Sequence, residues 1–197
     1  VTKGGYMETH PAVGQHSGGW ADLTFGFKYV LIDDMESNFI LTAGMTATTP
    51  NGDRKILHGR GSGFLNPFLS FERGWGDFHL MGTLVYNQAL HRDSNSSHLH
   101  YGLNADYHAC DWFIPFVSAV AWTVTDAGNS VPLNLEGYDA VNFGSSGSYG
   151  RTQVVLGAGF RTRFNEHFDI GIAYQKSVAT PRGLFDDRIT VDCVMRF

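Results

Sequence analysis

Apolar and polar residues alternate with a period of two through most of this chain, and this pattern constrains the fold more than any other feature of the sequence. The clearest case is the segment in which Leu99, Tyr101 and Leu103 alternate with His100 and Asn104. Such alternation puts the apolar side chains on one face of a β-strand and the polar ones on the other. The pattern recurs in residues 23–31, 39–45, 65–71, 78–86, 99–107, 112–122, 154–160, 168–174 and 189–197. The sequence therefore predicts an all-β protein of about nine strands.

The composition agrees with a β-protein that has many turns. The 197 residues include 24 glycines and 14% aromatic residues, whereas only 17% are charged, against about 25% in an average protein. A disordered chain would be poor in aromatic residues and rich in charge, so that class is excluded. The net charge of −5 argues against a nucleic-acid partner, because nucleic-acid binders carry basic surfaces. Two cysteines, Cys110 and Cys193, are too few for a disulfide scaffold.

Strand length and the alternation of the connections point to a membrane barrel. The predicted strands are about nine to twelve residues long, close to the 9–11 that a tilted strand needs to cross a bilayer and longer than the five or six of a typical soluble strand. Tight periplasmic turns that alternate with long external loops are typical of outer-membrane barrels. The short connections here are 33–37, 74–77, 110–111 and 165–167, and the long ones are 48–63, 88–97, 125–149 and 177–187.

We therefore expect residues 1–197 to form a single domain, a transmembrane antiparallel up-and-down β-barrel of a bacterial outer membrane. A large soluble β-sandwich with polar outer faces is the alternative, and alternation alone does not separate the two. On the barrel interpretation Leu103, Phe116, Leu156 and Ile170 face lipid. Trp112 and Trp122, ten residues apart, would mark two aromatic girdles. The residues predicted to line the lumen are Asp22, Lys28, Glu72, His79, His98, His100, Asn104, Asp106, Gln153, Arg161, Arg163, Asp169, Asp192 and Arg196.

Histidines and serines suggest a metal site and a serine hydrolase, and the sequence favours neither. His98 and His100 lie two apart on one strand, so they point the same way and could share a metal ion, but hydrated lumen residues are the favoured interpretation. A serine hydrolase would need G-x-S-x-G, and residues 144–148 lack the final glycine. We expect no metal, no cofactor and no enzymatic activity.

The long connection 125–149 carries more apolar residues than a purely solvated loop needs. We expect it to fold inward as a constriction or to pack on a neighbouring chain, whereas an ordinary external cap is the alternative. Its acidic residues would favour cations or neutral solutes. The residues predicted to form the constriction are Leu133, Glu136, Tyr138, Asp139 and Phe143.

The last segment ends in Phe197, with apolar residues at every second position before it, and it is similar to the C-terminal assembly signal of bacterial outer-membrane proteins. From about residue 17 onward the chain resembles the outer-membrane β-barrel family described by the words "MetA-pathway of phenol degradation". The segments that carry the resemblance are 19–29, 49–54, 66–69 and 180–182. They are structural motifs, and no catalytic residue carries over from the family.

The resemblance implies a transporter-like barrel of about twelve strands that passes small molecules, often aromatic or apolar. Residues 1–19 show no convincing strand, so we expect that N-terminal strands are missing or that another chain completes the barrel. We expect the chain to pass small molecules across the membrane. Its expected partners are the lipid bilayer and a solute, together with a second copy of the chain or another envelope protein, and we expect no nucleic-acid partner. The alternatives are a structural barrel that anchors or sheathes a larger assembly and an outer-membrane hydrolase.

Overall fold

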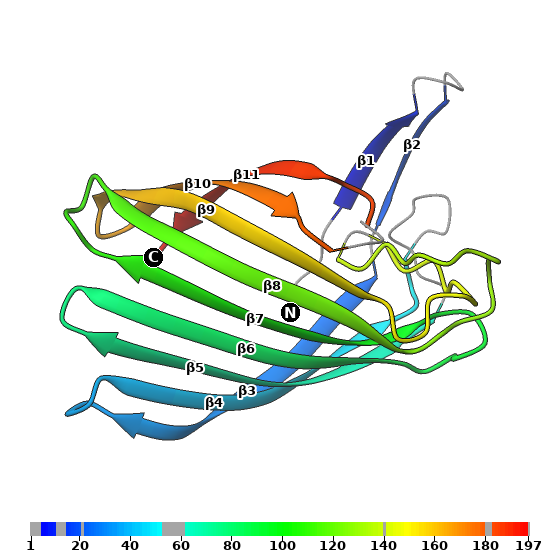
Figure 1. Cartoon of the computed structure of the whole chain (residues 1–197), viewed down its shortest axis with the longest axis horizontal. Coiled ribbons are helices and arrows are strands. Elements are labelled where there is room, and N and C mark those ends of the chain that lie inside the picture. The colour runs from blue at the N-terminus through cyan, green and yellow to red at the C-terminus, as the bar shows by residue number, and fades with distance from the viewer. Residues whose placement is uncertain are drawn as a thin grey trace.

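The computed structural model describes residues 5–10, 15–20, 22–52, 62–139, 141–179 and 183–196, with only the backbone described before Trp20. These residues form an all-β structure (Figure 1). The strands are β1 (Gly5–His10), β2 (Gln15–Trp20), β3 (Leu23–Asp34), β4 (Phe39–Thr49), β5 (Phe64–Trp75), β6 (Phe78–Ala89), β7 (Ser97–Tyr107), β8 (Ile114–Asp126), β9 (Thr152–Asn165), β10 (Phe168–Ser177) and β11 (Asp187–Met195). Among the described residues, no helix is long and apolar enough to cross a membrane.

Strands β3 to β11 form one antiparallel sheet in which every strand pairs with its neighbours in the sequence. The predicted all-β, up-and-down arrangement of nine strands is thus confirmed. The short turns gather at the left of Figure 1 and the long loops at the right, so the predicted alternation of short and long connections is also confirmed. We call these two ends of the sheet the turn end and the loop end.

A separate hairpin precedes the sheet. Strands β1 and β2 pair antiparallel, from Gly5 opposite Trp20 to His10 opposite Gln15. The expectation that residues 1–19 hold no strand was therefore wrong. The two strands pair through their backbones. Their sequence lacks the regular alternation of apolar and polar residues that identified the other strands, so it gave no sign of this hairpin.

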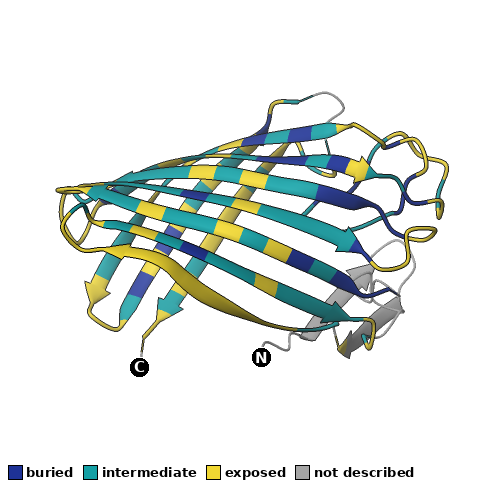
Figure 2. Cartoon of the chain, turned by 90° about the horizontal axis from the view of Figure 1, so that it is seen from below, coloured by how far each residue is buried: buried dark blue, intermediate teal, exposed yellow. Residues whose placement is uncertain are grey.

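The sheet curls, and its two faces are chemically different (Figures 1 and 2). One continuous row of cross-strand partners lies on the concave face, which we call the inner face. This row climbs from the turn end of β3 to the loop end of β11, so the strands are staggered as in a sheared barrel. In strand order its members are Asp33, Ile40, Glu72, Met81, Asn104, Ser118, Gly157, Gln175 and Arg188.

The outer face is apolar and exposed. Phe27 in β3 is 67% exposed and Val191 in β11 is 66% exposed, and large apolar side chains occupy outer positions on every strand between them. Charged residues at outer positions lie only within three residues of a strand end, so the middle of the face carries no charge. These residues are Asp34, Arg73, Asp126, Lys176 and Asp187.

Strand β8 faces the opposite way from the sequence prediction. Phe116 pairs with Asp106 and Trp122 with His100, and both partners belong to the inner face. The prediction that Phe116 faces outward was therefore wrong. Strand β8 carries apolar residues at both parities, for example Val117 as well as Phe116, so alternation did not fix its orientation. Trp122 is only 7% exposed, so it forms no outer aromatic girdle.

Aromatic residues instead gather at the turn end. The rings of Trp75 and Phe78 lie 5.9 Å apart. Trp112 meets Phe164 edge-on at 5.6 Å, and Phe164 in turn lies 5.6 Å from Phe168. Trp112, which was predicted to mark one girdle, therefore lies in an aromatic cluster at the turn end, whereas Trp122 does not.

Candidate functional site

A cavity of about 660 Å³ lies along the inner face. Its lining runs from Lys28 on β3 to Gln175 on β10, so it spans the hollow of the curled sheet. The lining mixes charged, amide and hydroxyl groups with apolar side chains such as Met81 and Phe116. A second cavity of about 340 Å³ lies at the turn end and shares Ile40 and Glu72 with the first. The two cavities therefore adjoin at Ile40 and Glu72.

The predicted lumen residues that lie within strands all occupy inner-face positions. They are Lys28, Glu72, His79, His98, His100, Asn104, Asp106, Gln153, Arg161, Arg163, Asp169 and Asp192. Asp22 and Arg196 lie just outside the strands, and the Asp22 carboxylate accepts a 2.7 Å hydrogen bond from the backbone of Gly52. Only Lys28, Glu72 and Asn104 line the main cavity, and His79 lines the smaller one.

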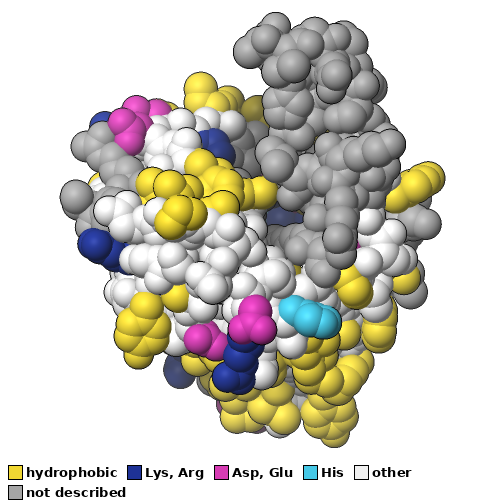
Figure 3. Space-filling view, turned by 90° about the vertical axis from the view of Figure 1, so that its right-hand side faces the viewer, with side chains coloured by type: hydrophobic (Ala, Val, Ile, Leu, Met, Phe, Trp, Pro, Cys, Tyr) yellow, Lys and Arg dark blue, Asp and Glu magenta, His cyan; other side chains and the backbone are white. Residues whose placement is uncertain are grey.

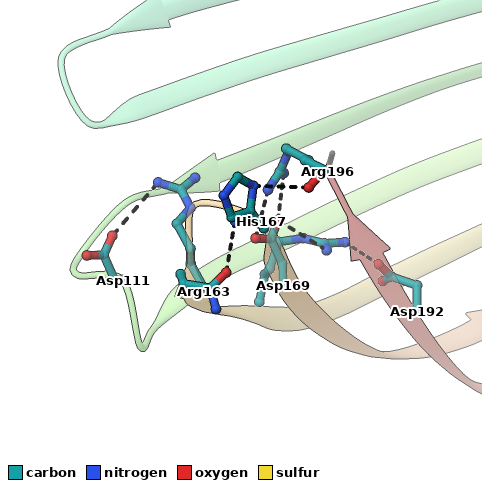
Figure 4. Close-up of polar contacts among 8 residues, drawn as sticks. Asp111, Arg163, His167, Asp169, Asp192 and Arg196 are labelled. Atoms are coloured by element: carbon teal, nitrogen blue, oxygen red, sulfur yellow. Dashed lines mark hydrogen bonds and ion pairs between the residues drawn. The ribbon is translucent and has the colours of Figure 1, made fainter.

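Most of the remaining charged residues neutralise one another in a cluster at the turn end (Figure 4). Arg196 donates two hydrogen bonds, of 2.9 and 2.7 Å, to the carboxylate of Asp169, which is 1% exposed. Arg161 donates one of 2.6 Å to Asp192. Hydrogen bonding to Asp169 raises the pKa of Arg196. Because carboxylates hold these arginines, the cluster ties β9, β10 and β11 together and offers little net charge to a solute.

Arg163 and the histidines also have partners. Arg163 lies 3.8 Å from Asp111 of the preceding turn. His79 Nδ1 lies 2.8 Å from the Asp106 carboxylate. The ring of His100 stacks on Trp122 with 5.0 Å between centroids and 6° between planes, and His98 is buried. The part of the chain that the structure describes contains no group of three or more potential metal ligands.

The loop between β8 and β9, residues 127–139 and 141–151, is organised around Glu136. This carboxylate is 0% exposed. It accepts hydrogen bonds from the Ser96 hydroxyl at 2.7 Å and from the backbone of Gly137, Phe143 and Ser145. The prediction treated Glu136 as a charge facing the passage, whereas the structure places it inside the loop as a structural acceptor.

Ser96 and Asn142 complete this arrangement, and the sequence analysis did not single them out. The amide of Asn142 accepts a hydrogen bond from the Ser96 backbone and donates one of 2.7 Å to the Ser96 carbonyl. Ser96 belongs to the preceding loop, 40 positions before Glu136. No local pattern in the sequence signals a contact over that distance.

The loop reaches across the inner face at the loop end. Tyr138 is 1% exposed and belongs to a buried cluster with Trp122, Val124 and Val155. Burial raises the pKa of the Tyr138 phenol, and the nearby Glu136 carboxylate raises it further. The next residue, Asp139, accepts a 2.6 Å hydrogen bond from Arg188 of β11. The segment around Tyr138 and Asp139 thus crosses from β8 to β11, and we call it the strap.

The other two predicted constriction residues, Leu133 and Phe143, are less buried than Glu136 and Tyr138. Leu133 is exposed and Phe143 is half-buried. Figure 3 views this end, where uncharged groups in white and hydrophobic side chains in yellow form most of the described surface. Phe197, the predicted assembly signal, lies outside the described residues.

No family model matches the chain, and no curated protein matches it.

Proposed function

We propose that this chain forms an outer-membrane β-barrel that passes small molecules along its inner face. The observation that carries the proposal is the outer face of the sheet, which is apolar, exposed and free of charge away from the strand ends. A contiguous apolar surface of this extent needs a partner, and the hydrocarbon of a bilayer is one that covers a convex face on all sides.

Strand length supports the same conclusion. Strands β3 to β11 are 9 to 14 residues long, enough to cross a bilayer at a tilt. Within hydrocarbon every backbone N–H and C=O must be paired. In the described sheet β3 and β11 are the edge strands, so the proposal requires further strands or another chain between them to close the barrel. The ring pairs at the turn end, such as Trp112 with Phe164, suit the aromatic belt found where a barrel meets the membrane interface.

The inner face supplies the passage in this proposal. Its cavity combines Lys28, Glu72, Asn104 and Gln175 with apolar surface, a lining that suits small water-soluble solutes. The strap narrows the loop end, where the solute would enter from outside. Resemblance to the MetA-pathway family supports a transporter-like role, with about twelve strands in the complete barrel.

Two substitutions on neighbouring residues of β7 test the membrane orientation. Leu103 faces outward and Asn104 inward near the middle of the strand. Leu103→Lys places a charge in hydrocarbon, which costs about 2–4 kcal/mol at the midplane of a barrel, so the yield of folded protein in liposomes should fall sharply. Asn104→Lys should fold as well as wild type.

Passage itself is tested by current across a planar bilayer that contains the purified full chain. We expect discrete conductance steps, with an altered amplitude for Asn104→Lys, which adds a charge to the cavity. A chain that folds in water without detergent, or an inserted protein that carries no current, would overturn the proposed function.

A further inference from the structure

We infer, on the basis of the proposed function, that the passage conducts small cations in preference to anions. Two inner-face carboxylates near the turn end, Asp33 and Glu72, set this selectivity. The sequence analysis had assigned a cation preference to the long loop, but Glu136 is buried within that loop and Asp139 is paired with Arg188.

Asp33 and Glu72 flank one residue on the inner face. Asp33 pairs with Ile40 across β3 and β4, and Ile40 pairs with Glu72 across β4 and β5. The two acidic residues are therefore two strand spacings apart, about 10 Å between Cα atoms. Ile40 and Glu72 line both cavities, and Asp33 lines the smaller one. The carboxylates thus stand where the two cavities meet.

The charges of these residues are available to a solute. Within the described residues, neither carboxylate makes a hydrogen bond or an ion pair, in contrast to Asp169 and Asp192 of the turn-end cluster. Asp34 also borders the smaller cavity, but it occupies an outer position at the strand end, where Ser37 donates a hydrogen bond to it. Asp33 and Glu72 therefore give the inner face an excess of negative charge where the two cavities adjoin.

Lys28 is the opposing charge in the main cavity. It precedes Asp33 by five positions on β3, about 15 Å along the strand, which exceeds the screening length of about 8 Å at physiological salt. Lys28 therefore weakens the field of the carboxylates without cancelling it. Even in water, one unit charge at about 4 Å attracts an ion by roughly RT to twice RT, so a preference of roughly fivefold for potassium over chloride is expected.

The reversal potential in a tenfold gradient of potassium chloride measures this preference. We expect wild type to favour potassium, Glu72→Gln and Asp33→Asn each to reduce the ratio, and the double variant to remove the preference. Lys28→Gln should move the ratio in the opposite direction. Glu166→Gln is the matched control, because this carboxylate belongs to an exposed turn outside the lining of both cavities, and it should leave the ratio unchanged.

The outcomes separate the two proposals. A folded, inserted chain without current overturns the proposed function, and this inference with it. Current that is unselective or favours chloride overturns the inference alone, as does a potassium preference that the Glu72 and Asp33 variants leave intact. Circular dichroism of each variant in liposomes establishes that the compared proteins are equally folded.

Discussion

Arg188 donates a 2.6 Å hydrogen bond to the carboxylate of Asp139 and so joins the last strand to the loop that crosses the inner face. The same guanidinium donates to Gln175 at 2.8 Å and lies 4.3 Å from the ring of Phe185. Because Tyr138, next to Asp139, is buried near β8 and β9, the strap is held on both sides of the loop end.

Removing this ion pair should loosen the strap. A partly exposed pair contributes up to about 1 kcal/mol, which corresponds to roughly a fivefold change in the ratio of open to closed strap. Asp139→Asn and Arg188→Gln should therefore each raise the mean current or the frequency of full openings in single-channel records. The control is Lys176→Gln, which removes an ion pair with Asp187 on the outer face at the same end. Equal effects from the control would assign the change to general destabilisation.

Glu136→Gln should release the whole loop. The amide places a donor where the carboxylate accepts from the Ser96 hydroxyl and from backbone N–H groups. Hydrogen bonds to a charged group contribute about 1.5–3 kcal/mol each, so protease cleavage within residues 127–151 should become at least tenfold faster. Asp93→Asn, in an exposed part of the preceding loop, should leave the cleavage rate unchanged. Resistance of the Glu136→Gln loop to protease would contradict its organising role.

The loop should also weaken at high pH through Tyr138. Its pKa is raised in the folded state, so the folded loop retains the phenol proton to a higher pH than the unfolded loop does. Stability is then lost as the pH rises above about 10, the ordinary value for tyrosine. Protease sensitivity of the loop should increase between pH 9 and 11 in wild type and increase less in Tyr138→Phe. Tyr149→Phe, which alters an exposed tyrosine of the same loop, should behave like wild type.

Single cysteines introduced into a variant without Cys110 and Cys193 should report the two faces. A water-soluble maleimide should label positions 104 and 118, which face the cavity. It should not label positions 103 and 156, which face outward, once the protein is in liposomes. Position 116 should label with the inner set, contrary to the expectation from sequence. Position 153 should resist labelling despite its inner parity, because Gln153 is 1% exposed.

The strands of the sheet were predictable because their pattern is local. Every second residue of 99–107 is apolar, and the structure places β7 at Ser97–Tyr107. The alternation of short and long connections was visible for the same reason, since turn residues such as Gly76 lie between two such segments. These features depend on neighbours within a few residues.

The features that the sequence did not predict depend on residues far apart in the chain. Trp122 is buried because Tyr138 and Val155 join its cluster, and nothing within β8 itself indicates which face that loop will cover. From the sequence, Glu136 looks like an exposed charge in a loop. In the fold it is enclosed because Ser96, 40 positions earlier, and nearby backbone N–H groups donate hydrogen bonds to it. The sequence predicted that Arg161 and Asp192 lie on the inner face. It did not predict that they pair with each other, because they are 31 positions apart.

The order of pairing in the sheet has a consequence for how the chain folds. Because each strand pairs only with the strands before and after it in the chain, no strand has to be threaded between two others. The entropy cost of each new pairing is that of closing a single connection, and it is smallest for the hairpins with short turns, such as β3–β4 and β9–β10. Those hairpins should form first and then pair with one another. Strands β8 and β9 should pair last, because the loop 127–151 between them is the longest connection in the sheet and must also form its contacts with Ser96 and Arg188.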